Sequence, residues 1–202
     1  MTLKKDGRSK LSRALKRAKA IEWKPRPELL LGDTIPAPMH GMAPRVVLGA
    51  RWWDETRKAA YKSTGYHCVA CGVHKRDAEG RQWLEGHEAY RVDYTKLRMK
   101  YLECVPLCHY CHNYLHRGRL DALLESGEVH QAKYVAIIQH GDRVLREAGL
   151  EPKRPHESLV INQDEWGRWR LVVGRRRFKP LFSSYEEWLE HHEKEKEAEE
   201  DA

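Results

Sequence analysis

The sequence predicts a mixed α+β fold, with a central four-cysteine module, flanking helices and a small C-terminal β unit. Two Cys-x2-Cys pairs enclose a segment of strand-like residues at the centre of the 202-residue chain. Residues 51–64 have the composition of a helix, and Gly65 is a typical helix end. Residues 158–182 contain short apolar runs separated by turn residues, which indicates strands. Together these three observations favour the α+β class.

The cysteine pairs, Cys68 with Cys71 and Cys108 with Cys111, have the spacing of zinc knuckles. Two intervening residues allow a tight turn to direct both thiolates at one ion. Four thiolates make the closed tetrahedral site that structural Zn²⁺ prefers. The alternative is two unrelated pairs of reduced cysteines. We expect a structural zinc ion, and we expect the fifth cysteine, Cys104, to be a small buried residue in a strand.

Three histidines in the same segment predict a second metal site. His112 and His116 are four residues apart, so on a helix they share one side, with Cβ atoms roughly 5–6 Å apart. His87 lies in the strand-like segment between the knuckles. Three neutral nitrogen ligands with an open position are typical of catalytic metal sites. The alternative is that these histidines are separate surface or capping residues.

The order Cys-x2-Cys, LE-x-H, VPLC-x2-CH-x3-H resembles the HNH endonucleases, whose core is a ββα-metal fold held together by zinc. The resemblance covers about 50 of the 202 residues. It implies that His87, His112 and His116 hold a catalytic divalent metal such as Mg²⁺, Mn²⁺, Ni²⁺ or Zn²⁺. It also implies that Glu88 stands in the place of the general base.

Two positions depart from the family pattern. Glu88 replaces the usual histidine, and Glu103 stands near the place of the family's asparagine. Asn113 is close in the sequence but lies on the other side of the second knuckle. The chain therefore resembles an H-E-H variant of the family.

The resemblance implies a metal-dependent endonuclease or nickase that hydrolyses DNA phosphodiester bonds, with Glu88, His87 and His112 as its catalytic residues. The alternative is a weakly active or inactive module of the same fold that binds nucleic acid or protein as a regulator or inhibitor. Nucleic acid is the expected partner, DNA before RNA, and the second reading adds a protein partner. Small proteins of this family are often phage-borne, which would place the chain in the host cytoplasm.

Composition agrees with an anionic partner. The formal net charge is +7, the isoelectric point is near 9.1, and 33% of the residues are charged. A basic balance suits nucleic acid first, and a mean hydropathy of −0.79 argues against a large core. No apolar run approaches the ~18 residues of a membrane span, and we see no signal-peptide pattern. Reduced cysteines fit a cytoplasmic setting with no membrane partner.

We expect five regions along the chain: a basic N-terminal arm (1–28), a Pro-rich linker (29–50), the zinc domain with its following helices (51–150), a small β-hairpin plus helix unit (156–192) and an acidic tail (193–202). The arm carries ten Lys or Arg and three acidic residues. Phosphate contacts are expected from Lys10, Arg13, Lys16 and Arg17 of the arm and from Arg117 and Arg119 after the second knuckle. A solvated basic helix without a partner is the alternative for the arm.

Overall fold

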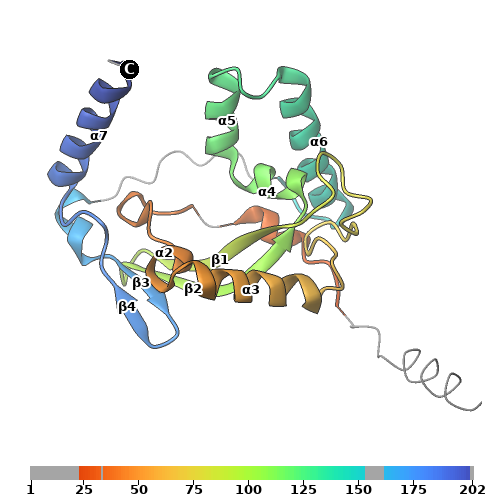
Figure 1. Cartoon of the computed structure of the whole chain (residues 1–202), viewed down its shortest axis with the longest axis horizontal. Helices are drawn as coiled ribbons and strands as arrows, with labels where there is room; N and C mark the ends of the chain where they lie inside the picture. The colour runs from red at the N-terminus through yellow and green to blue at the C-terminus, as the bar shows by residue number, and fades with distance from the viewer. Residues whose placement is uncertain (1–22, 33, 153–161, 201–202) are drawn as a thin grey trace, which may run out of the picture.

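A sheet of four strands forms the centre of the fold in the computed structural model, which describes residues 23–32, 34–152 and 162–200 (Figure 1). The spatial order is the chain order: β1 (Glu85–Asp93), β2 (Arg98–Leu107), β3 (Arg170–Val173) and β4 (Arg176–Phe178). Strands β1 and β2 are an antiparallel hairpin, β3 lies parallel to β2, and β4 turns back along β3. The expected α+β class is confirmed. The C-terminal strands extend the central sheet instead of forming a sheet of their own.

A bulge divides the hairpin into two parts. Ala89 pairs with Glu103 and Tyr90 with Tyr101, so β2 has one extra residue, Leu102, at this point. A bulge increases the local twist of a strand pair. The part of the hairpin before the bulge packs against helices, whereas the part after it pairs with β3.

Helices cover both faces of the sheet (Figure 1). The α-helices of the described residues are α2 (Pro44–Leu48), α3 (Ala50–Ser63), α4 (His109–Leu115), α5 (Arg117–Glu125), α6 (Gln131–Glu147) and α7 (Tyr185–Glu200). The same residues form short 3-10 turns at η1 (Pro27–Leu31), η2 (Ala37–Met39) and η3 (Gln163–Arg168). The helix predicted at 51–64 is therefore confirmed as α3. Ser184 caps α7, since its Oγ accepts a hydrogen bond from the backbone N–H of Glu187 at 3.2 Å.

Two hydrophobic clusters stabilise the two faces. The first lies between the β1–β2 hairpin and α4–α6 and includes Val105, Leu107, Leu120, Ile137 and Leu145. The second lies on the other face and includes Met39, Met42, Met99, Trp169 and Leu171. Helices α4 and α6 cross closely because Gly141 has no side chain. A Cβ atom at that position would overlap the ring of Tyr114.

The Pro-rich segment wraps around the domain. Leu30 is buried in the first cluster, and Met39 and Met42 are buried in the second. Short 3-10 turns suit this segment because each proline removes a backbone donor and restricts its neighbour. The segment predicted as a Pro-rich linker (29–50) therefore packs onto the domain.

Candidate metal centres

The four cysteines of the predicted knuckles form one cluster, with all four Sγ atoms within 4.8 Å of one another. Cys68 and Cys71 lie in a tight turn closed by a hydrogen bond from the Gly72 N–H to the Cys68 carbonyl. Cys108 is the N-cap of α4, and its Sγ accepts a hydrogen bond from the N–H of Cys111 at 3.4 Å. The cluster is therefore positioned by one loop, the end of β2 and the first turn of α4.

The cluster has the dimensions of a zinc site. Tetrahedral Zn²⁺ with Zn–S bonds of about 2.3 Å places its sulfur atoms about 3.8 Å apart. Sγ of Cys71 and Sγ of Cys108 are 3.8 Å apart, and none of the cysteines is in a disulfide. Hydrogen bonds with the surrounding thiols, Cys108 first, hold the pKa of Cys68 far below its usual value. The same neighbours raise the pKa of Cys111, so full ionisation of the cluster requires a cation.

His140 of α6 contacts this cluster and was not singled out by the sequence. Its Nε2 lies 3.3 Å from Sγ of Cys111 and 4.0 Å from Sγ of Cys108. A ring N–H at this distance can donate to a thiolate sulfur. The residue lies beyond the second knuckle in a different helix, so the spacing within the Cys-x2-Cys pairs does not identify it.

The three predicted histidines also come together. His87 on β1 faces α4, and Nδ1 of His87 lies 3.1 Å from Nε2 of His116. With His112 they supply three nitrogen atoms within 4.8 Å of one another. Ligands at about 2.0–2.1 Å from a tetrahedral ion are about 3.3 Å apart, which this spacing fits. Burial lowers the pKa of His87 to about 2 and that of His116 to about 4, so both rings are neutral near pH 7.

Glu85 links the two clusters. Its Oε1 lies 2.8 Å from Nδ1 of His109, which follows Cys108, and its Oε2 lies 2.6 Å from Nδ1 of His112. The His112 contact is close but lacks the alignment of a hydrogen bond, and this Nδ1 has no hydrogen-bond partner among the described residues. Burial works to raise the pKa of Glu85, but the His109 and His112 rings lower it more, and the net pKa is well below its usual value.

Glu88, the residue in the place of the general base, is buried and ion-paired. Both of its carboxylate oxygens accept hydrogen bonds from Nη1 of Arg45, at 2.9 and 3.0 Å. Alternation along β1 directs Glu88 and His87 to opposite faces of the sheet. Because β1 is an edge strand, the same cavity of about 730 Å³ is nevertheless lined by His87, Glu88 and His116. Burial raises the pKa of Glu88.

The two candidates for the family's asparagine lie outside the histidine cluster. Glu103 is exposed and ion-paired with Arg26, with 2.7 Å between Oε1 and Nη1. Asn113 is buried in α4, where its Nδ2 donates to the His109 carbonyl at 2.8 Å. The side chain of Asn113 therefore stabilises the first turns of α4.

The cations after the second knuckle line the cavity. Arg117 donates from Nε to Asp121 at 3.2 Å and lies over the ring of Tyr134, while Arg119 is exposed. Both belong to the lining of the cavity at the histidine cluster. The predicted phosphate contacts of the arm, Lys10, Arg13, Lys16 and Arg17, lie outside the described residues.

A third group of ligand-type residues lies on α7. His191, His192 and Glu195 offer atoms within 4.8 Å of one another, but His191 and Glu195 are exposed.

Among the described residues, no helix is long and apolar enough to cross a membrane. Comparisons of the chain with protein-family models, curated proteins and solved structures found no match.

Proposed function

We propose that this chain is a metal-dependent endonuclease or nickase of the HNH type that hydrolyses DNA phosphodiester bonds. The observation that carries the proposal is the convergence of His87, His112 and His116 beside a cavity that two of them, His87 and His116, line together with Glu88 and two arginines. A β-hairpin and a helix supply these histidines, and a four-cysteine cluster fixes the start of that helix. This is the arrangement that the sequence resemblance implies.

The four-cysteine cluster would hold a structural zinc ion. Its ligands come from a loop and from the junction of β2 and α4, two segments that no disulfide joins. Because such a site rarely exists in the unfolded chain, its binding free energy is folding free energy. The zinc would thereby hold α4, and with it His112 and His116, against the hairpin.

The histidines would hold the catalytic metal, and a divalent ion bound there supplies Lewis-acid stabilisation of the scissile phosphate. The neutral rings of His87 and His116 keep their lone pairs for a ligand role near pH 7. Arg117 and Arg119, which line the cavity, would contact the neighbouring phosphates. Glu85, with Oε2 2.6 Å from Nδ1 of His112, would orient this ring once the two groups align as a hydrogen bond.

Glu88 would accept the proton of the attacking water. An ordinary Glu is about two pKa units less basic than His, a difference of roughly 3 kcal/mol. Burial of Glu88 raises its pKa and recovers part of that basicity. Arg45 opposes this by favouring the charged carboxylate, so movement of Arg45 away from Glu88 would yield the stronger base.

A second function is favoured by two ion pairs. Glu88 is engaged by Arg45, and Glu103 by Arg26, at the two positions where the chain departs from the family pattern. A module with these residues committed to structure would bind nucleic acid or protein without cleaving it. It would act as a regulator or inhibitor.

Plasmid nicking tests the two functions against each other. In the enzyme, supercoiled DNA is nicked only with added Mg²⁺, Mn²⁺, Ni²⁺ or Zn²⁺, and His112→Ala or His116→Ala abolishes nicking while the cysteine-bound zinc stays. Glu88→Gln costs about 10²–10⁴-fold, and Glu88→His retains or raises the rate. His130→Ala, an exposed histidine at the start of α6, is the matched control and leaves the rate unchanged. A wild-type protein and a Glu88→His variant that are both inert in every metal would establish the binding module instead.

A further inference from the structure

The strand register gathers cations on one face of the sheet. Side chains alternate along a strand, and cross-strand partners project to the same side. The pairs Arg91–Lys100, Asp93–Arg98, Arg98–Arg170, Lys100–Val172 and Val172–Arg177 therefore share one face across all four strands. We call this set (Arg91, Asp93, Arg98, Lys100, Arg170, Val172 and Arg177) the basic sheet face.

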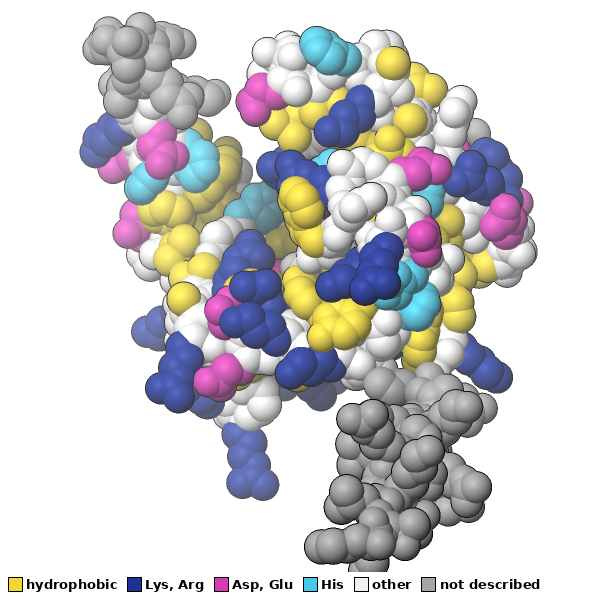
Figure 2. All heavy atoms as spheres, turned by 45° about the vertical axis from the view of Figure 1, so that its right-hand side comes forward, with side chains coloured by type: hydrophobic (Ala, Val, Ile, Leu, Met, Phe, Trp, Pro, Cys, Tyr) yellow, Lys and Arg dark blue, Asp and Glu magenta, His cyan; other side chains and the backbone are white. Residues whose placement is uncertain are grey.

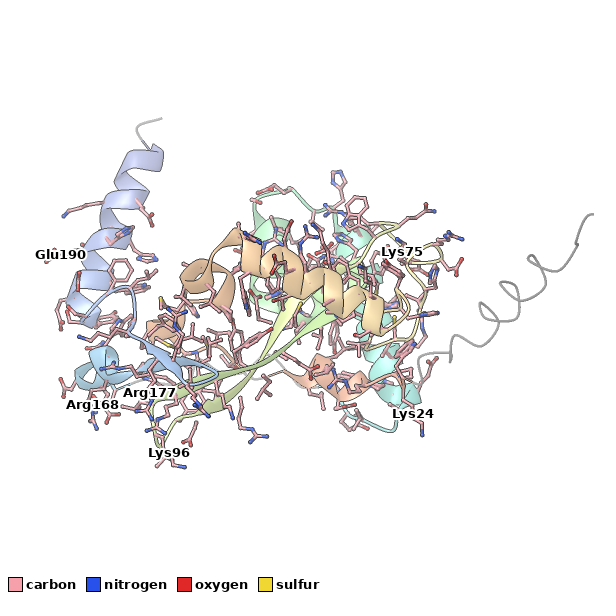
Figure 3. The ribbon with its side chains drawn as sticks, turned by 60° about the horizontal axis from the view of Figure 1, so that its bottom comes forward. Lys24, Lys75, Lys96, Arg168, Arg177 and Glu190 are labelled. Atoms are coloured by element: carbon pink, nitrogen blue, oxygen red, sulfur yellow. The ribbon has the colours of Figure 1, made fainter. Side chains whose placement is uncertain are left out.

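The basic sheet face is open to solvent because the opposite face is the buried one. Met99 and Leu171, the residues between these cations on β2 and β3, are fully buried in the second hydrophobic cluster. Arg91, Arg98, Lys100 and Arg177 are exposed. Figure 3 shows Lys96 and Arg177 at the same end of the molecule, and Figure 2, turned from the view of Figure 1, shows Lys and Arg side chains spread over its lower left.

The remaining polar members of the face are already engaged. Arg170 is half-buried and donates from Nη1 to the carbonyls of Gly167 and Trp169, at 2.7 and 2.6 Å. Asp93 accepts a hydrogen bond from the N–H of Lys96, and its carboxylate lies 3.5 Å from the Lys96 Nζ. The acid is thus neutralised locally, and four exposed cations dominate the face.

The basic sheet face lies on the same side of the sheet as the histidine cluster. His87, Ala89 and Arg91 alternate along β1, and His87 and Ala89 both face the α4 side. Four residues of an antiparallel strand span about 13 Å, so the first cation lies that far along the strand from His87. Successive phosphates of one B-DNA strand are about 3.4 Å apart along the axis, so this is roughly four nucleotides.

We propose that the basic sheet face binds the sugar–phosphate backbone of duplex DNA beside the stretch held at the histidine cluster. The inference rests on the proposed function, since it adds to the DNA-cleaving site a surface that selects duplex DNA. Charge complementarity favours a polyanion. Among the strand residues that the structure describes, none on this face is aromatic, whereas surfaces for single strands stack bases on aromatic rings. Val172 is the face's one apolar member, too little for insertion into a membrane.

A charge-removal series on the full-length, zinc-loaded chain tests the proposal. The face variant carries Arg91→Gln, Arg98→Gln, Lys100→Gln and Arg177→Gln. The control variant carries the same change at four exposed cations of α3 and α6: Arg51, Lys62, Lys133 and Arg146. Both lose the same net charge. Anisotropy of a labelled duplex, without added divalent metal, gives Kd between about 50 and 200 mM salt. Zinc content and circular dichroism verify folding.

Each phosphate contact contributes a slope of about 0.9 in log K against log salt, or roughly tenfold in affinity at 0.1 M salt. We expect the face variant to bind duplex at least about 100-fold more weakly, with a slope smaller by about 3–4. The control variant should change by less than about threefold. Equal losses in both variants, or an unchanged face variant, would overturn the proposal. So would a face variant that loses binding only to anionic vesicles or only to single strands.

Nicking by the wild-type chain, measured in parallel, separates this inference from the proposed function. If the wild type nicks plasmid DNA while the face variant binds duplex normally, the proposed DNA-binding role of the basic sheet face is refuted and the proposed nuclease function is supported. If no metal supports nicking while the face variant loses duplex binding, the nuclease function is refuted and the DNA-binding role of the face is supported.

Discussion

Replacing Arg45 with Met should destabilise the fold through Glu88. The Glu88 side chain is only 7% exposed, and Nη1 of Arg45 donates to both of its oxygens. Met keeps much of the aliphatic length of Arg but has no donor. The variant therefore leaves an ionised carboxylate buried without a partner.

Breaking a fully buried ion pair from one side costs about 3–5 kcal/mol. The Arg45 side chain is 52% exposed, so water replaces part of the lost hydrogen bonding, and we expect about 2–3 kcal/mol. For a chain of this size, that lowers Tm by about 4–12 °C. Glu88→Gln should cost about 1 kcal/mol or less, because the half-exposed guanidinium left behind can be hydrated. The double variant should resemble Glu88→Gln alone.

Urea unfolding at several pH values, with zinc content checked, measures these differences. Burial raises the pKa of Glu88 above its ordinary value of 4.5, so above that pH the folded state binds more protons than the unfolded state. The group's contribution to stability is complete below the ordinary pKa and falls as pH rises through the folded pKa. The free energy of unfolding of the wild type, relative to that of Glu88→Gln, should therefore increase as the pH is lowered from about 7 to about 5. The increase should be larger for Arg45→Met. A cost below about 0.5 kcal/mol, or an equal cost in the Glu88→Gln background, would refute the reasoning.

Four further changes have defined outcomes. Cys108→Ser should unfold or aggregate the central domain, because zinc binding is folding free energy; a folded, monodisperse protein that contains no zinc by elemental analysis would contradict the zinc site. Gly141→Ala should cost about 1–3 kcal/mol in urea titrations, since the new methyl group overlaps the Tyr114 ring, and Tyr114→Ala in the same chain should relieve the clash. Deletion of residues 1–24 should flatten the salt dependence of DNA binding, and an unchanged slope would give the arm another use. Glu85→Gln should weaken Ni²⁺ binding at the histidine cluster by about 10–100-fold in calorimetry. Unchanged Ni²⁺ binding in a variant that retains its zinc would show that the contacts of Glu85 with His109 and His112 do not support metal binding.

Local spacing explains what the sequence could predict. A Cys-x2-Cys turn and an i, i+4 pair each determine side-chain direction within a few residues, so the four-cysteine cluster and the His112–His116 pair followed from spacing alone. The helix at 51–64 followed from composition and an end signal in the same way.

Long-range pairing explains what the sequence could not predict. His140 reaches the cysteines from α6, and Arg45 reaches Glu88 from a segment 43 residues earlier. The parallel pairing of β3 with β2 joins residues about 70 positions apart, such as Arg98 and Arg170, and no local pattern encodes a partner. The basic sheet face depends on that pairing. The sequence alone therefore could not place the arginines of β3 and β4 on one face with the cations of β1 and β2.

The histidine cluster depends on the cysteine cluster, but the reverse does not hold. Cys108 and Cys111 define the first turn of α4, and His109 and His112 follow them directly, so loss of an ion from the proposed zinc site would release the turn that orients His112. Glu85 contacts both His109 and His112 and so ties this turn to β1, the strand that carries His87. Loss of His112 or His116, in contrast, removes no ligand and no backbone hydrogen bond from the cysteine cluster. The histidine cluster therefore requires the cysteine cluster, and the cysteine cluster does not require the histidines. This asymmetry makes the two sites separable by substitution, because chemistry lost at the histidines with zinc retained is distinct from a fold that has lost its zinc.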